Sequence, residues 1–293
     1  MLQTNDLCGV FVPVVAPFLP NGALDLASFR RYVAGLLAFD IQGIVVNGTT
    51  GECPTVAWEE AAALVRAAQE VAAAQKRPVP IVVGTGTNDT AASVRRTELA
   101  GRLGADAALV VTPYYSRPSQ EGIEAHYRLI AEVGVPVIAY EIPARTGVRL
   151  TADTMLRILE LDGVIGVKDS SGSTALLAEL MRHKTKPVLC GDDALLCDML
   201  RLGARGGILA SANVRTPLFL ETCRLAAAGD MAAAERAFAP LRPVIERLFR
   251  EPNPAPLKRL LARHGMIAAD AVRLPLAPIS PALAHELELE PLN

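Results

Sequence analysis

The sequence is poor in the residues that most often mark metal centres and disulfide frameworks. Its five cysteines are scattered and form no C-x-x-C pair, which argues against both a disulfide framework and a zinc site. The four histidines are isolated, and neither H-E-x-x-H nor G-x-S-x-G occurs, so metal-dependent hydrolysis and a Ser-His triad are poor hypotheses. We expect no metal site and a reducing compartment, the cytoplasm.

Charge and hydrophobicity argue against two further classes of protein. The formal net charge is only −2, and no stretch gathers charges of one sign, so nothing supports binding to nucleic acid or to a membrane surface. No apolar run reaches the roughly 18 residues of a membrane span. The first ten residues lack a charged region followed by an apolar one, so we expect no signal peptide.

One pattern recurs along the chain: a short β-branched run, a turn rich in small polar residues, and a longer amphipathic segment with helical periodicity. Aromatic residues make up only 4% of a sequence that is 51% hydrophobic, so Ala, Val, Leu and Ile must form most of the core. The predicted strands are VFVPVVAPF (10–18), GIVVNG (43–48), PIVVGTG (80–86), AALVVTPYY (107–115), PVIAYEIP (136–143), VIGVKDSS (164–171), PVLCGDD (187–193) and GGILASANV (206–214).

Continuously apolar strands indicate a parallel sheet that is buried on both faces. Eight strand–helix units in roughly 230 residues match the size of an α/β (β/α)8 TIM barrel. A doubly wound open sheet uses the same units, but its glycine fingerprint fails in GTGTND (84–89), where Asp89 takes the last glycine position. The sequence therefore predicts a barrel catalytic domain over residues 1–228. Residues 229–293 are predicted to form a C-terminal helical extension packed on the barrel.

Lysine is scarce, because only five of the 29 basic residues are lysines. Lys76, Lys184 and Lys186 lie at a helix end or in a polar turn, and Lys258 lies on a late amphipathic helix. Lys168 alone follows an apolar strand and precedes a loop, in VIGVKDSSG. A lysine at such a place is most often a surface residue, and a buried one is most often paired with a carboxylate.

In a barrel, functional groups project from the carboxyl ends of the strands. The groups predicted there are Thr49, Thr50, Tyr114, Tyr115, Tyr140, Arg145, Lys168 and Gly191. A lysine in the barrel mouth loses solvation, which disfavours its ammonium form, and a neutral amine can attack a ketone to form a Schiff base. Tyr140 and the hydroxyls of Thr49 and Thr50 could move the proton. Taken singly, each residue fits a structural role equally well: the threonines as turn-forming residues and Tyr140 as a residue of the packed core.

Several motifs in the same order resemble the dihydrodipicolinate synthase/N-acetylneuraminate lyase family. They are GTTGE (48–52), VTPYYSRPSQEG (111–122), YEIPARTG (140–147), GVKDSSG (166–172), GDD (191–193), NPAPLKRLL (253–261) and RLPLAPIS (273–280). The resemblance spans nearly the whole chain. It implies a class I, cofactor-free, pyruvate-dependent aldolase on a TIM barrel, in a homotetramer built as a dimer of dimers.

The resemblance also implies roles for single residues. Lys168 would form the Schiff base with pyruvate and Tyr140 would be the general acid and base. Thr49 and Tyr115 would complete a proton relay, with Tyr115 contributed by the neighbouring subunit.

The substrate-binding residues implied are Thr50, the backbone at Ile208, Gly191 and Arg145. Thr50 and Ile208 would hold the pyruvate carboxylate. Arg145, in RTG, suits the carboxylate of aspartate semialdehyde, because a planar guanidinium donates two parallel hydrogen bonds.

Three functions are therefore under consideration. The first is a lyase that condenses pyruvate with aspartate semialdehyde in lysine biosynthesis. The second is a pyruvate-dependent aldolase or dehydratase of a sugar acid or another keto acid, because Glu141 and the Asp169–Ser171 sequence depart from common synthase patterns. The third is a non-catalytic keto-acid binder.

Overall fold

Eight strands follow one another in chain order and close into a barrel in the computed structural model, which describes residues 1–292. They are β1 (Gly9–Pro13), β2 (Gly43–Val46), β3 (Ile81–Gly84), β4 (Ala107–Val111), β5 (Val137–Glu141), β6 (Val164–Asp169), β7 (Val188–Cys190) and β8 (Gly206–Ile208). The recorded strand pairs are parallel, as between β4 and β5. The prediction of a barrel rather than an open sheet is confirmed.

Each predicted strand runs past the carboxyl end of the observed one. The run predicted at 107–115 ends as a strand at Val111, before Pro113, and the run at 206–214 ends at Ile208. Sequence hydrophobicity continues into these loops because apolar residues such as Ala212 and Val214 are also buried there, although their N–H groups bond only within the loop. Hydrophobicity therefore reports burial, whereas the strand ends where the ladder of backbone hydrogen bonds ends.

Helices occupy the segments between and after the strands. They are α1 (Leu26–Leu36), α2 (Trp58–Ala74), α3 (Thr90–Arg102), α4 (Gln120–Ala131), α5 (Pro143–Thr146), α6 (Ala152–Glu160), α7 (Ala175–Leu180), α8 (Leu196–Arg201), α9 (Thr216–Ala227), α10 (Met231–Phe238), α11 (Arg242–Phe249), α12 (Ala255–Arg263) and α13 (Pro281–Leu287). Several begin at a side chain that accepts a hydrogen bond from the first turn, including Asp25 for α1 and Asp89 for α3.

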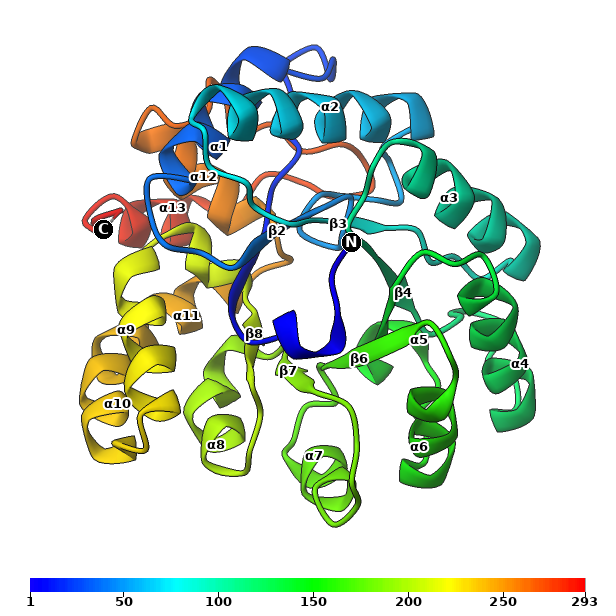
Figure 1. Cartoon of the computed structure of the whole chain (residues 1–293). Helices are drawn as coiled ribbons and strands as arrows, with labels where there is room; N and C mark the ends of the chain where they lie inside the picture. The colour runs from blue at the N-terminus through cyan, green and yellow to red at the C-terminus, as the bar shows by residue number, and fades with distance from the viewer. Residues whose placement is uncertain (293) are drawn as a thin grey trace. The chain divides into compact units, whose positions relative to one another are not determined.

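The chain forms two compact units. The first comprises residues 1–9 and Val82–Ile208, and the second comprises Val10–Ile81 and the chain from Leu209 on. In the first unit every residue of β5 and β6 is buried, as strands covered on both faces require. In the second, α9 and α10 lie side by side (Figure 1) and meet through an edge-to-face contact of Phe219 with Phe238.

Four α-helices, α10 to α13, and a 3-10 helix at Ala239–Leu241 follow α9 in the described part of the second unit. The predicted division into residues 1–228 and 229–293 stays a prediction. None of the described helices is long and apolar enough to cross a membrane.

Candidate active site

Lys168 lies near the carboxyl end of β6 and is buried, with 6% of its surface exposed. The register of β5 on β6 places Tyr140 directly beside it, and the Lys168 Nζ lies 4.2 Å from the centre of the Tyr140 ring. Among residues 1–292, no carboxylate lies within ion-pair distance of this nitrogen. A buried lysine without a paired carboxylate departs from the usual structural role, because an unpaired buried charge is costly. This amine is therefore suited to chemistry.

Gly191, which follows β7, leaves the space that the Lys168 side chain occupies. A Cβ at position 191 would lie 2.1 Å from Ser170 Oγ and 2.7 Å from Lys168 Cε. A side chain fits there only if both Ser170 and Lys168 move. The structure therefore brings three of the predicted residues together: Lys168, Tyr140 and Gly191.

Two buried carboxyl groups that the sequence reasoning did not assign lie in this part of the barrel, and one of them, Asp192, interacts electrostatically with Lys168. Burial raises the pKa of Asp192, while the positive charge of Lys168 opposes that shift. Burial also raises the pKa of Asp169, whose Oδ1 accepts a hydrogen bond from Ser171 N at 2.9 Å. The GDD and VKDSS motifs carry both residues. The sequence signal was therefore present, and the structure adds the interaction of Asp192 with Lys168.

Glu141 is fully buried on β5 and is tied to the protein rather than directed toward Arg145. Its Oε1 accepts a hydrogen bond from Leu150 N at 2.9 Å, and its Oε2 accepts one from Thr112 Oγ1 at 3.2 Å. Burial raises the pKa of this carboxyl group. Glu141 thus anchors the chain between β5 and α6 through these two hydrogen bonds.

Tyr115 and Arg145 lie on two segments that contact each other. Tyr115 adopts a left-handed backbone conformation with φ of 71°, and its N–H donates to the Thr146 carbonyl at 3.3 Å. The Tyr115 side chain projects into solvent, with 89% of the residue exposed. Arg145, on α5, is also exposed and has no ion-pair partner in the described part of the chain. Ile208 is buried at the end of β8.

Thr49 and Thr50 lie in the second unit, in the turn after β2. Thr50 is buried, and its Oγ1 accepts a hydrogen bond from Asn253 Nδ2 at 3.1 Å. Thr49 is half-buried. Lys168 belongs to the first unit, and the meeting of these hydroxyls with Lys168 stays a prediction.

Lys258 is a second buried lysine, which the helical pattern of its segment did not reveal. Its Nζ forms an ion pair with Glu52, donates to the Ala271 carbonyl at 2.8 Å, and lies 4.1 Å from the centre of the Phe18 ring. Burial lowers the pKa of Lys258 to about 8, although the charge of Glu52 opposes the shift. Lys258 has the paired carboxylate that Lys168 lacks, and its contacts indicate a structural role.

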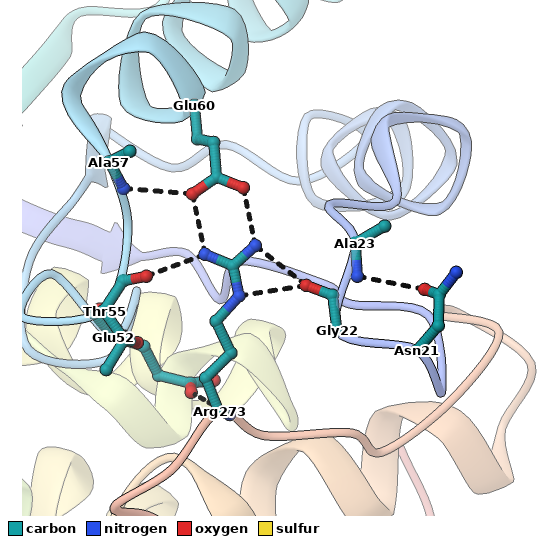
Figure 2. A network of polar contacts seen from close by, with 8 residues as sticks. All are labelled: Asn21, Gly22, Ala23, Glu52, Thr55, Ala57, Glu60 and Arg273. Carbon is teal, nitrogen blue, oxygen red and sulfur yellow. Dashed lines mark hydrogen bonds and ion pairs between the residues drawn. The ribbon is translucent and has the colours of Figure 1, made fainter.

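Arg273, in the C-terminal part of the chain, also contacts Glu52 and the segments around it. Its guanidinium lies between Glu60 and the Gly22 carbonyl (Figure 2), donating to them at 2.6 Å and 2.8 Å. The backbone N–H of Arg273 donates to Glu52 Oε2 at 3.0 Å. Both oxygens of Glu52 therefore have partners, which compensates part of the cost of burying its charge.

A closed parallel barrel with an unpaired, buried lysine near a strand end defines a class of barrel enzyme whose chemistry begins at an amine. Comparison with known proteins identifies the family. The model of the dihydrodipicolinate synthetase family matches residues 6–290, and the chain belongs to this family.

Individual relatives are similar over almost their whole length. The 4-hydroxy-tetrahydrodipicolinate synthase of Thiobacillus denitrificans is 40% identical over 283 residues, which cover 96% of this chain and 94% of that protein. The enzyme of the same name from Nitrosomonas europaea is 41% identical over 282 residues, covering 95% of each chain. Among solved structures, the chloride-inhibited dihydrodipicolinate synthase of Acinetobacter baumannii, in complex with pyruvate, superposes with a TM-score of 0.92 at 36% identity, covering 96% of each chain.

Proposed function

We propose that this chain is a Schiff-base-forming lyase that condenses pyruvate with L-aspartate 4-semialdehyde to 4-hydroxy-tetrahydrodipicolinate, in lysine biosynthesis. The observation that carries the proposal is the buried amine of Lys168, which has no ion-pair partner among the described residues and lies against the Tyr140 ring. The family and the names of its similar members support the same reaction. The enzyme acts in the cytoplasm and requires no cofactor.

Lys168 begins the reaction. Its neutral amine attacks the ketone carbon of pyruvate, and loss of water leaves an imine. The protonated imine withdraws electrons, so a methyl proton leaves and an enamine forms. The enamine carbon then attacks the aldehyde carbon, the aldehyde oxygen takes up a proton, and the imine to Lys168 is restored. The amino group of the second substrate then attacks this imine carbon, which closes the ring and releases the Lys168 amine.

Tyr140 is the acid and base in these steps. Its position beside Lys168 in the β5–β6 register supports the assignment, since proton transfer requires a group within reach of the reacting atoms. Thr49 and Tyr115 complete the relay that carries the proton between Tyr140 and solvent.

The substrate carboxylates are bound at two places. Thr50 and the backbone at Ile208 hold the pyruvate carboxylate, and Gly191 keeps the space beside Lys168 open. Arg145 binds the carboxylate of the second substrate. Its exposure and its lack of an ion-pair partner within residues 1–292 leave the guanidinium available for a bidentate contact.

The functional assembly is a homotetramer built as a dimer of dimers, in which Tyr115 enters the site of the neighbouring subunit. The 89% exposure of Tyr115 supports this, because a tyrosine that serves only its own chain would be packed against it. The left-handed backbone at Tyr115 is a conformation that few non-glycine residues adopt without a local reason.

Substrate profiling tests the proposal. Purified protein is incubated with pyruvate and a panel of aldehydes that includes aspartate semialdehyde, succinate semialdehyde and several sugar aldehydes, and the products are identified by mass spectrometry. We expect aspartate semialdehyde to give the highest kcat/KM. Succinate semialdehyde lacks the amino group of aspartate semialdehyde, so it shows whether that group is required for turnover. Preference for a sugar aldehyde would contradict the synthase assignment and favour the sugar-acid aldolase, while turnover of no aldehyde would favour the keto-acid binder.

A further inference from the structure

The turn that carries Thr49 and Thr50 is held by its own backbone. Two non-glycine residues flank it in the left-handed region, Asn47 with φ of 59° and Glu52 with φ of 55°. The Gly48 carbonyl accepts hydrogen bonds from Gly51 N at 3.0 Å and from Cys53 N at 3.3 Å. The turn therefore has a defined backbone, so the orientation of its hydroxyl groups depends on the side chains that contact them.

The side chain of Asn253 forms a hydrogen bond with Thr50. Its Nδ2 donates to Thr50 Oγ1 at 3.1 Å, and both residues are buried. An amide NH2 group can only donate, so the Thr50 oxygen is the acceptor in this bond. A hydroxyl group has one proton, and that proton is left to donate to another group. Thr50 is therefore suited to donate a hydrogen bond to an anion.

The segment that carries Asn253 is fixed to the same turn by a second contact. Lys258, five residues further along, forms the buried ion pair with Glu52, which lies two residues after Thr50. The Lys258 N–H donates to the Pro254 carbonyl at 2.9 Å, so the charged contact and the amide contact lie on one continuous backbone. Two polar contacts therefore hold Asn253 in place relative to Thr50.

We propose that Asn253 is a positioning residue for pyruvate, because its amide occupies the Thr50 oxygen and leaves the Thr50 proton to donate to the pyruvate carboxylate. The proposal rests on the function proposed above and deepens its carboxylate site. A purely structural Asn253 would support the turn without setting the direction of this proton.

The test reverses the polarity of the contact at nearly constant size. In Asn253→Asp, a carboxylate oxygen accepts the Thr50 proton and adds negative charge, so both effects oppose an anionic substrate. Asn253→Ala removes the donor without adding charge. Asp230→Ala, which removes the N-cap of α10, is the control for a general loss of stability.

The readout is the pyruvate concentration that gives half-maximal borohydride-trapped adduct, with the melting temperature measured in parallel. We expect Asn253→Asp to raise this concentration roughly 10- to 100-fold, as for a lost hydrogen bond to a charged group. Asn253→Ala should raise it less, and Asp230→Ala should change only the melting temperature. The KM of the aldehyde should stay within about twofold of the wild-type value, because the contact proposed for the aldehyde substrate is with Arg145.

A double-mutant cycle of Thr50→Val with Asn253→Ala completes the test, because Asn253→Ala adds no charge of its own. Once the hydroxyl is absent, Asn253→Ala should have no further effect on pyruvate binding. An unchanged half-saturating concentration in Asn253→Ala, or an effect that persists in full beside Thr50→Val, overturns this inference alone. Absence of any pyruvate adduct in the wild-type protein overturns the proposed function, and this inference with it.

Discussion

Removing the Lys258 ammonium should strongly destabilise the protein. The side chains of Lys258 and Glu52 are both fully buried, so Lys258→Met leaves the Glu52 carboxylate charged, buried and without its cation. Breaking such a pair from one side costs about 3–5 kcal/mol. The unfolding entropy of about 2.1 cal/mol/K per residue amounts to about 0.6 kcal/mol/K for this chain, so the melting temperature should fall by about 5–8 °C.

Differential scanning calorimetry at pH 7 measures this change, at a pH below the Lys258 pKa of about 8. Arg30→Met is the matched control, because Arg30 pairs with Glu70 at 2.7 Å on the surface of the same unit. An exposed pair contributes at most about 1 kcal/mol, so this variant should melt within about 2 °C of the wild-type protein.

The double variant Glu52→Gln with Lys258→Met distinguishes a buried charge from lost packing. The neutral amide introduced by Glu52→Gln can still accept the hydrogen bond from Arg273 N, and the cost of burying an unpaired carboxylate is removed. The double variant should therefore be more stable than Lys258→Met alone. Wild-type stability of Lys258→Met, or further loss in the double variant, would refute the reasoning.

Three further predictions concern the reaction and the pH dependence of stability. Tyr140→Phe should still form the pyruvate adduct but lose roughly 10²–10⁴-fold in turnover, as expected for a positioned acid and base; steady-state turnover near the wild-type value would leave Tyr140 a core residue. Arg145→Ala should weaken the second substrate by about 2–5 kcal/mol in kcat/KM if the bound carboxylate is buried and left unpaired, and an effect on pyruvate alone would contradict its assignment. Burial lowers the pKa of His126 to about 4 from 6.5, so the unfolded chain binds the proton more readily than the folded chain. The contribution of His126 to the free energy of unfolding is therefore complete above pH 6.5 and is lost as the pH falls toward 4. Relative to His126→Asn, the wild-type protein should lose roughly 3 kcal/mol across that range in urea denaturation, and parallel pH profiles would contradict this.

The barrel was predictable from the sequence because its signals are local. Each strand is a short apolar run, and each helix has its own periodicity, so the order of elements could be derived from neighbouring residues. The carboxyl ends of the strands were harder to predict from the sequence. Burial continues through Ala212 and Val214, beyond the last inter-strand hydrogen bond, which Leu209 N donates to the Phe11 carbonyl. Composition alone does not separate burial from strand pairing.

The candidate site was predictable to the extent that its residues occur at strand ends. Lys168, Tyr140 and Gly191 are adjacent because neighbouring parallel strands place their ends together. Lys258 was not identified as buried, because its partner Glu52 lies 206 residues away in sequence. The hydrogen bond between Leu150 N and Glu141 was not predicted, because it depends on the conformation of the loop that joins them.

Pyruvate trapping with borohydride tests the central claim most directly, because reduction converts the imine into a stable amine. After incubation of the whole protein with pyruvate and borohydride, intact mass spectrometry and peptide mapping should locate one reduced pyruvyl group on Lys168. Lys258 should remain unmodified, since its nitrogen is buried and paired with Glu52, and Lys168→Arg should abolish labelling. Labelling at another lysine, or no pyruvate-dependent labelling of the folded wild-type protein, would contradict the account.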